Sequence, residues 1–453
     1  MAVFNVWSIV ALLAASYCAT SQAEGPVAAP EISKSAATSA DGNGSPADLS
    51  TLVRQLGDDL FAVRENATAQ LIQTGIKAKP QLVAVLDSSD AEVRRRAKQI
   101  LAAVVDEDFQ RRLNAFRADV DGSKQTSLPC WNLFKQTIGS DAQARQLFSE
   151  MQTTESALLE AYEQGPKQAS KLIESRAQAA AEGIGSSARR GQRPQAATLG
   201  TALAILFVAG DPKVELNDPT AANIVQLPSI LQSSNVPIVV QQSLTAKPPR
   251  TEANARTEMC LKVLGRWVAR DISLALVQKN LECADAYRLK EGLQPAIKVI
   301  QARATLPPGT VRGPLVPAPA GVQFRAVQQM IPAPPEVLCR AVWVVGKLGN
   351  KEQLPLIEPL LSDAQVCFST PSGAQPLEAQ MRDVALAATI QISGKDPKEF
   401  GFEFLSQAAN VQYNGNRFAF RSEEARNAAF KKWEDWKNSQ KQAVGDEKKP
   451  ASS

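Results

Sequence analysis

The sequence predicts an all-α protein in which antiparallel helix pairs stack into an α-solenoid. Three observations lead to this fold class. Seven positions of the segment from Leu52 to Leu71 recur thirty residues later, and such self-similarity is typical of a stacked repeat. Within each copy the apolar residues recur at helical rather than strand spacing. A related pattern returns after Glu336, so we expect helical repeats towards both ends of the chain.

Each copy of the repeat is predicted to form a helix, a tight turn and a second helix. Gly57 and the aspartates that follow it favour a helix end and then a new N-cap. Because one helix pair cannot bury its apolar face alone, neighbouring pairs must stack. The positions that define the second helices are Val63, Arg64, Ala67, Leu71, Asp90, Val93, Arg94, Ala97 and Leu101.

The pattern Asp-x-x-Val-Arg-x-x-Ala-x-x-x-Leu, which begins at Asp90, resembles the second helix of a HEAT repeat. Its thirty-residue period resembles the compact, armadillo-type units of the phycobilisome-lyase kind. The resemblance covers 49–105 and, more loosely, 336–392, where it includes Ala341, Arg382 and Ala385. It is shared with secreted bacterial HEAT-repeat proteins of unassigned activity. It implies that Arg64 and Arg94 are structural and reach towards an aspartate of a neighbouring turn.

The N-terminal segment has the features of a signal peptide. Residues 1–23 contain no charged residue, and the apolar run from Val6 to Ala15 is too short for a comfortable membrane span. We expect cleavage after Ala23. An uncleaved signal anchor is the alternative, because no Lys or Arg precedes the apolar run. Residues 24–47 are rich in Ala, Ser, Pro and Gly, which predicts a flexible linker.

Composition and local patterns divide the rest of the chain into further predicted segments. The apolar segment Ala196–Ala209 is predicted to be a buried helix, and Asn414-Gly415 permits one small hairpin near the C-terminus. Trp433 and Trp436 share one face of a predicted capping helix. In order, the predicted segments are N-terminal helical repeats (48–181), a linker (182–195), a central helical region (196–303), a Pro-rich loop (304–325), C-terminal repeats with the capping helix (326–438) and a disordered tail (439–453).

The cysteines leave two interpretations open. Of six cysteines, Cys18 lies in the expected signal peptide, and the odd remainder argues against a fully paired framework. An oxidising compartment permits pairs, and proximity along the chain makes Cys260–Cys283 and Cys339–Cys367 candidate disulfides. The alternative is that these cysteines are small buried residues on helices.

Composition excludes several classes of function. The chain has 0 histidines, which removes Ser-His-Asp and Cys-His catalysis and His-ligated zinc. Its net charge of +4 gives no argument for nucleic acid. No nucleophile–base pair, phosphate-binding loop or metal cluster is evident, so no catalytic, cofactor-binding or metal-binding residue is assigned.

We therefore expect a non-catalytic extracytoplasmic module, in the periplasm, the cell envelope or the medium. Its helical surface would bind a protein or peptide, and no membrane span is expected beyond the signal segment if that segment stays as an anchor. One alternative is a structural cell-envelope protein that self-associates or is tethered by its N-terminus. A lyase-like enzyme is the other, and it rests on the type of repeat alone.

Overall fold

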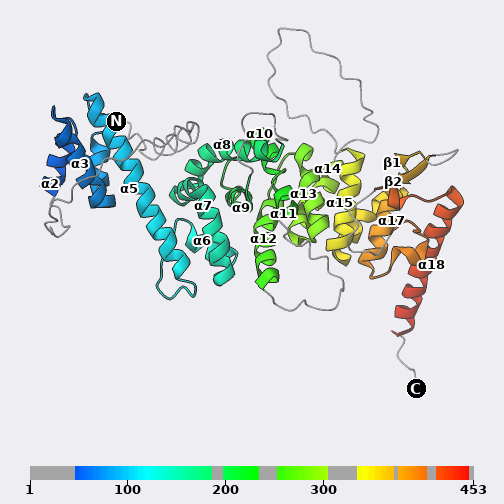
Figure 1. The fold of residues 1–453 in the computed structure, drawn as a ribbon. Helices are drawn as coiled ribbons and strands as arrows, with labels where there is room; N and C mark the ends of the chain where they lie inside the picture. The colour runs from blue at the N-terminus through cyan, green and yellow to red at the C-terminus, as the bar shows by residue number, and fades with distance from the viewer. Residues whose placement is uncertain are drawn as a thin grey trace, which may run out of the picture. The chain divides into compact units, whose positions relative to one another are not determined.

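A computed structural model of the chain describes residues 46–185, 197–233, 252–304, 334–371, 376–405 and 415–447. These residues are mostly helical and include one two-stranded sheet, as an all-α sequence predicts (Figure 1). The expected signal peptide, almost all of the linker and Pro-rich loop, and the expected turn at Asn414 lie outside them. Two compact units divide between Leu128 and Pro129. This division falls inside the predicted N-terminal repeat segment 48–181.

The first unit consists of two helix pairs that contact each other. The first helices of the pairs pack together, as do the second helices. A 3-10 turn, η1, connects the pairs after Gly75, whose φ of 67° ends the second helix. The elements are α2 (Pro46–Gln55), α3 (Phe61–Thr74), η1 (Gly75–Ala78), α4 (Lys79–Ala84) and α5 (Ala91–Ala118).

The predicted repeat positions form the core of this unit. Ala67 and Leu71 of α3, and Ala97 and Leu101 of α5, are at most 2% exposed. Because Ala67 and Ala97 are small, the second helices α3 and α5 can approach each other closely. The two copies differ at the valine position, because Val93 is buried whereas the equivalent Val63 is half-buried.

Helix α5 is longer than the repeat predicts. The resemblance to a repeat ends at residue 105. However, a single helix of 28 residues runs to Ala118. No Gly or Pro interrupts this stretch, so nothing in the backbone chemistry breaks the helix at Asp106.

The first half of the second unit packs around α9, whose residues are buried almost throughout, as predicted for Ala196–Ala209. Helix α7 contacts both α8 and α9, and α12 contacts α7 and α9. An aromatic cluster of Trp131, Phe134, Phe148 and Phe207 joins α6, α7 and α9. The helices are α6 (Trp131–Thr137), α7 (Ala142–Gln164), α8 (Pro166–Gly185), α9 (Leu199–Ala209), α10 (Asp218–Ile224), α11 (Pro228–Ser233) and α12 (Glu252–Val268).

The second half of this unit centres on α15 and α17. Gly346 of α15 lies against Ala388 of α17, and a Cβ at Gly346 would meet the Ala388 Cβ at 2.7 Å. The elements are α13 (Leu274–Tyr287), η2 (Lys290–Gly292), α14 (Leu293–Ala304), α15 (Pro335–Leu348), η3 (Lys351–Gln353), α16 (Leu354–Ile357), η4 (Glu358–Ser362), β1 (Val366–Thr370), β2 (Leu377–Gln380), α17 (Met381–Ile392), η5 (Pro397–Phe400), η6 (Gly415–Phe418) and α18 (Glu423–Glu447).

Two predicted boundaries are wrong. The linker expected from residue 182 begins inside α8, which continues to Gly185. The tail expected from Ser439 is helical as far as Glu447, because α18 continues without Gly or Pro until Gly445. Before α17, the antiparallel strands β1 and β2 lie within the segment 326–438, which was predicted to hold repeats and the capping helix.

Candidate functional site

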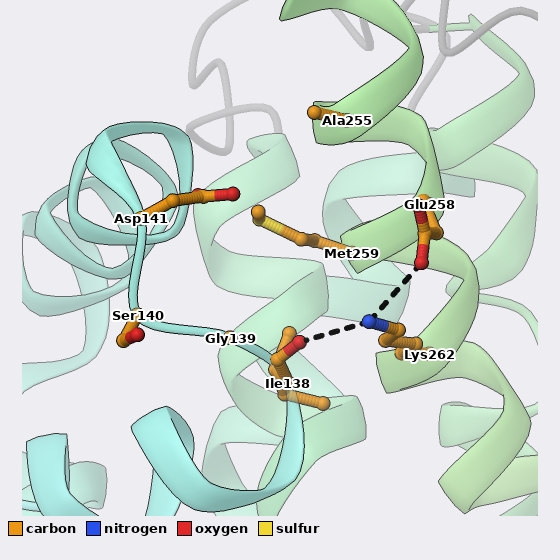
Figure 2. A pocket seen from close by; sticks show the side chains of 8 residues that line it. All are labelled: Ile138, Gly139, Ser140, Asp141, Ala255, Glu258, Met259 and Lys262. Atoms are coloured by element: carbon orange, nitrogen blue, oxygen red, sulfur yellow. Dashed lines mark hydrogen bonds and ion pairs between the residues drawn. The ribbon is translucent and has the colours of Figure 1, made fainter. Parts of the chain in front are cut away.

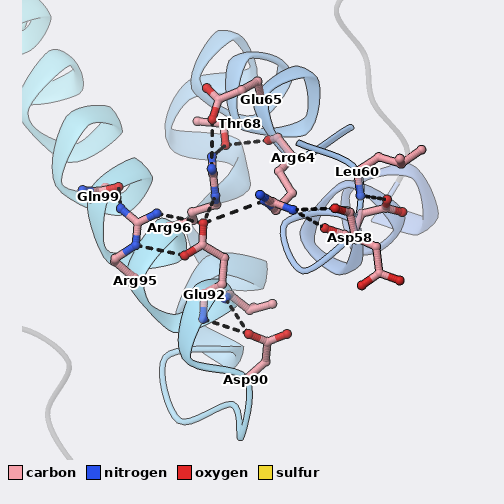
Figure 3. Close-up of polar contacts among 12 residues, drawn as sticks. Asp58, Leu60, Arg64, Glu65, Thr68, Asp90, Glu92, Arg95, Arg96 and Gln99 are labelled. Carbon is pink, nitrogen blue, oxygen red and sulfur yellow. Dashed lines mark hydrogen bonds and ion pairs between the residues drawn. The ribbon is translucent and has the colours of Figure 1, made fainter. Parts of the chain in front are cut away.

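The arginine of each repeat holds the turn that precedes its own helix. Arg64 Nη1 donates to the carbonyls of Asp58 at 2.6 Å and Asp59 at 3.0 Å. Arg94 Nη1 donates in the same way to the carbonyls of Ser88 and Ser89. The resemblance implied an aspartate as the partner. The observed acceptors are backbone carbonyls that a turn would otherwise leave to solvent (Figure 3).

The third predicted arginine is placed differently. Arg382 Nε donates to the Gln380 side chain at 2.6 Å, and Arg382 Nη2 approaches Glu423 at 3.2 Å. The acceptors of Arg382 are therefore side chains. The predicted alanines of this region, Ala341 in α15 and Ala385 in α17, are fully buried. The repeat pattern at residues 336–392 keeps its apolar positions but not the arginine contact.

A buried arginine that the repeat pattern does not include joins α3 to α5. Arg96 is 7% exposed. It donates to Glu92 at 2.6 Å, to Thr68 at 3.1 Å and forms an ion pair with Glu65 at 2.9 Å. Hydrogen bonds from Arg95 and then Arg96 lower the pKa of Glu92 to about 2. Glu92 therefore stays ionised under ordinary conditions, and this network makes the two second helices one rigid surface (Figure 3).

The turn between α2 and α3 exposes two large apolar side chains. Leu60 is 66% exposed and Phe61 is 64% exposed. The guanidinium of Arg64 lies 5.6 Å from the centre of the Phe61 ring, so the arginine that holds the turn also orients the ring. Solvent-exposed residues at this site are ordered by the repeat rather than left loose.

The two repeat copies differ most sharply at this turn. Thirty residues after Leu60, Asp90 accepts hydrogen bonds from the backbone N–H groups of Glu92 at 2.8 Å and Val93 at 3.2 Å. Leu60 occupies the same N-cap position of α3 and makes no side-chain cap. Sequence analysis did not select Leu60 or Phe61. Aligning the copies at the thirty-residue period would have found them, because Leu60-Phe61 stands opposite Asp90-Ala91.

The second unit has a small cleft between the turn before α7 and one face of α12. Its volume is about 260 Å³. Figure 2 shows Lys262 between Glu258 and the Ile138 carbonyl, 3.2 Å from each. Asp141 caps α7 by accepting from the Ala144 N–H at 2.9 Å. Each charged side chain of the cleft thus already has a structural partner, which does not favour a catalytic interpretation.

The five cysteines of the described chain are free thiols. Burial raises the pKa of Cys130 and Cys283 to about 12 and that of Cys260 to about 11. A thiol with a raised pKa is a poor nucleophile. Neither candidate disulfide is bonded in this structure, and both pairings stay predictions.

Comparison with protein-family models, curated proteins and solved structures finds no match for this chain. Within the described ranges, no group of three or more Cys, Asp and Glu side chains could hold a metal ion. None of the helices in those ranges combines the length and apolar character that crossing a membrane requires. The exposed Leu60-Phe61 pair remains the feature that local folding does not explain.

Proposed function

We propose that the chain is an α-solenoid of HEAT-like type that binds another protein, and that Leu60 and Phe61 are its contact residues. The observation that carries this proposal is the replacement of an N-cap aspartate by an exposed leucine next to an exposed phenylalanine. Replacing a good N-cap costs about 1 kcal/mol. A position that breaks a local rule without a compensating contact is a candidate for function.

The chemistry of the turn defines the partner. Asp58 and Asp59 precede the apolar pair, whereas Glu65, one helical turn after Phe61, is already paired with Arg96. Two carboxylates on one side of an apolar pair suit a segment whose apolar side chains lie next to Lys or Arg. Burying these two side chains against a partner contributes roughly 2–4 kcal/mol to the free energy of binding. That is enough for the pair to form the centre of a small interface.

Localisation outside the cytoplasm belongs to the same proposal. It rests on the uncharged, apolar segment before Glu24, which has the form of a signal peptide. Terminal sequencing of the protein isolated from its own cells should give a chain that begins at Glu24. A chain that still begins at Met1 in a membrane fraction would favour the signal anchor, and one in the cytosol would contradict this part of the proposal.

Site-directed photo-crosslinking tests the contact residues. A benzophenone amino acid replaces Phe61 in one chain and Val120 in a control, because Val120 is 59% exposed in the same unit. We expect an adduct with one protein, identified by mass spectrometry, from position 61 and not from position 120. Adding Leu60→Asp to the same chain should remove it.

The Leu60→Asp variant separates an effect on binding from an effect on folding. Its new aspartate is expected to cap α3 as Asp90 caps α5. The variant should therefore raise the free energy of unfolding by about 1 kcal/mol while it removes the adduct. An adduct with a second copy of this chain would support the self-associating envelope protein instead. Equal adducts at both positions, or one that survives Leu60→Asp, would contradict the proposed surface.

A further inference from the structure

Two cysteines of the C-terminal part of the chain lie in contacting elements of the second unit. Cys339 is in the middle of α15, and Cys367 is on β1, which packs against that helix. Cys339 is fully buried and Cys367 is 6% exposed. Both thiols therefore face the protein interior from elements that touch.

A β-bulge lies at Cys367. In the ladder between β1 and β2, Val366 pairs with Gln380 and Phe368 pairs with Ala379. Cys367 is the extra residue between them, where the ladder is interrupted. The neighbouring Val366 is 40% exposed while the Cys367 side chain is buried, so the thiol lies on the covered side of the strand.

The sulfur atoms around Cys339 form a compact group. Cys339 Sγ lies 3.8 Å from Met381 Sδ at the start of α17. After burial, a side-chain hydrogen bond with Cys367 is the largest contribution that raises the pKa of Cys339. Cys367 Sγ donates to the Gln365 carbonyl at 3.6 Å, and the same carbonyl accepts from the Met381 N–H at 2.9 Å. Met381 and Gln365 thus connect the surroundings of the two thiols.

The thiols of the other candidate pair, Cys260 and Cys283, do not influence each other in this way. Cys260 and Cys283 lie on the consecutive helices α12 and α13. Beyond burial, the neighbours that shift the pKa of Cys260 are chiefly Arg256 and Glu150, and those of Cys283 are Glu282 and Lys279. Each thiol responds to charged residues and not to the other thiol.

We propose that Cys339 and Cys367 are an oxidative modification site whose disulfide links the β1–β2 hairpin to α15. In the reaction, one thiolate attacks a low-molecular-weight disulfide such as glutathione disulfide and releases one glutathione. The second protein thiol then displaces the other glutathione. Two protein S–H bonds are lost, one protein S–S bond forms, and two molecules of glutathione carry away the protons and the electron pair. The inference does not depend on the proposed binding surface.

Mass spectrometry of the whole protein tests the site. Reduced full-length chain is incubated with glutathione disulfide in urea below the unfolding transition, because buried thiols react only when the hairpin opens. We expect a mass loss of about 2 Da and, after digestion without reductant, one linked peptide that contains Cys339 and Cys367. Cys367→Ala should abolish the link, while Cys260→Ala and Met381→Leu should retain it.

Unfolding in urea tests whether the bond holds the hairpin in place. Closing a loop of this length lowers the population of the opened chain by about two orders of magnitude in the entropy model. The oxidised protein should therefore unfold at a higher urea midpoint than the reduced protein, and Cys367→Ala should remove the difference. A link to another cysteine, full alkylation of both thiols after oxidation, or an unchanged midpoint would each overturn the proposal.

Discussion

Replacing Arg426 with methionine should destabilise the second unit severely, because it leaves a buried carboxylate unpaired. Arg426 donates to the two oxygens of Asp383 at 2.8 and 3.2 Å. The side chains of the pair are 5% and 0% exposed. Arg426 also donates to the Glu378 carbonyl at 3.1 Å and pairs with Glu423. One side chain thus joins β2, α17 and α18.

The expected loss is about 3–5 kcal/mol at neutral pH, which is typical of removing one partner of a buried ion pair. The Gln380 N–H still donates to Asp383 at 2.8 Å, but one neutral donor does not compensate for a buried charge. Methionine keeps an apolar stem in place, so the loss reports the charge more than the packing. Adding Asp383→Asn removes the unpaired charge, and the double variant should be more stable than Arg426→Met alone.

The loss should depend on pH with a definite sign. Burial raises the pKa of Asp383, and its hydrogen bonds and Arg426 oppose that rise. Without Arg426 the pKa climbs further, so the folded variant holds this proton more tightly than the unfolded chain does. Protonated Asp383 is cheap to bury, so the penalty begins as pH rises above the unfolded pKa and is complete once pH exceeds the folded pKa. The difference from wild type should therefore shrink between pH 7 and about pH 4.

Tryptophan fluorescence in urea measures this unit. Apart from Trp7, every tryptophan of the chain lies beyond Leu128, and α18 itself carries two. Arg421→Met is the matched control, because Arg421 and Glu403 form an ion pair whose side chains are 70% and 62% exposed. It should cost less than about 1 kcal/mol at either pH. The reasoning is refuted if Arg426→Met costs no more than this control, or if its cost is the same at both pH values.

Two further variants test the repeat contacts and the helix packing. Arg94→Met should lose about 1–3 kcal/mol, measured by far-UV circular dichroism in urea, because the carbonyls of Ser88 and Ser89 lose their donor. Arg94→Lys should lose less stability than Arg94→Met, because a single nitrogen of Arg94 makes both hydrogen bonds and the lysine amine can take its place. Equal losses in the two variants would contradict this reasoning. Gly346→Ala should cost about 1–3 kcal/mol by overpacking, because the added Cβ would meet both the Cβ and the backbone Cα of Ala388, at 2.7 and 2.8 Å. Adding Ala388→Gly should therefore recover little stability, and full recovery would contradict this reasoning.

The sequence predicts the first unit well because both copies of the repeat follow the same local pattern. Helical spacing identifies the buried faces, and the repeated Ala67 and Ala97 mark where helices approach. Helix termini are predicted less well. The end of α5 at Ala118 is one example, because the repeat period contains no information about where that helix stops.

The β1–β2 hairpin illustrates what local patterns miss. Its strands are short and include polar residues, and the bulge at Cys367 breaks the alternation that would reveal a strand. Its stability comes from packing against α15, a contact between segments far apart in the chain. Proximity along the chain suggested Cys339 and Cys367 as a pair, but only the fold explains why Cys367 faces inwards.

The exposed turn at Leu60 is harder to explain by folding alone. Terminal repeats of a solenoid usually carry a polar outer face, because an apolar one promotes association. Leu60 and Phe61 belong to the first described helix pair and do the opposite, while the second pair shows that Asp90-Ala91 satisfies the same backbone with a proper cap. Both arginines hold their turns equally, so the difference is not a defect of the repeat. The proposed binding surface accounts for this difference, because the centre of a protein interface is more apolar than its rim.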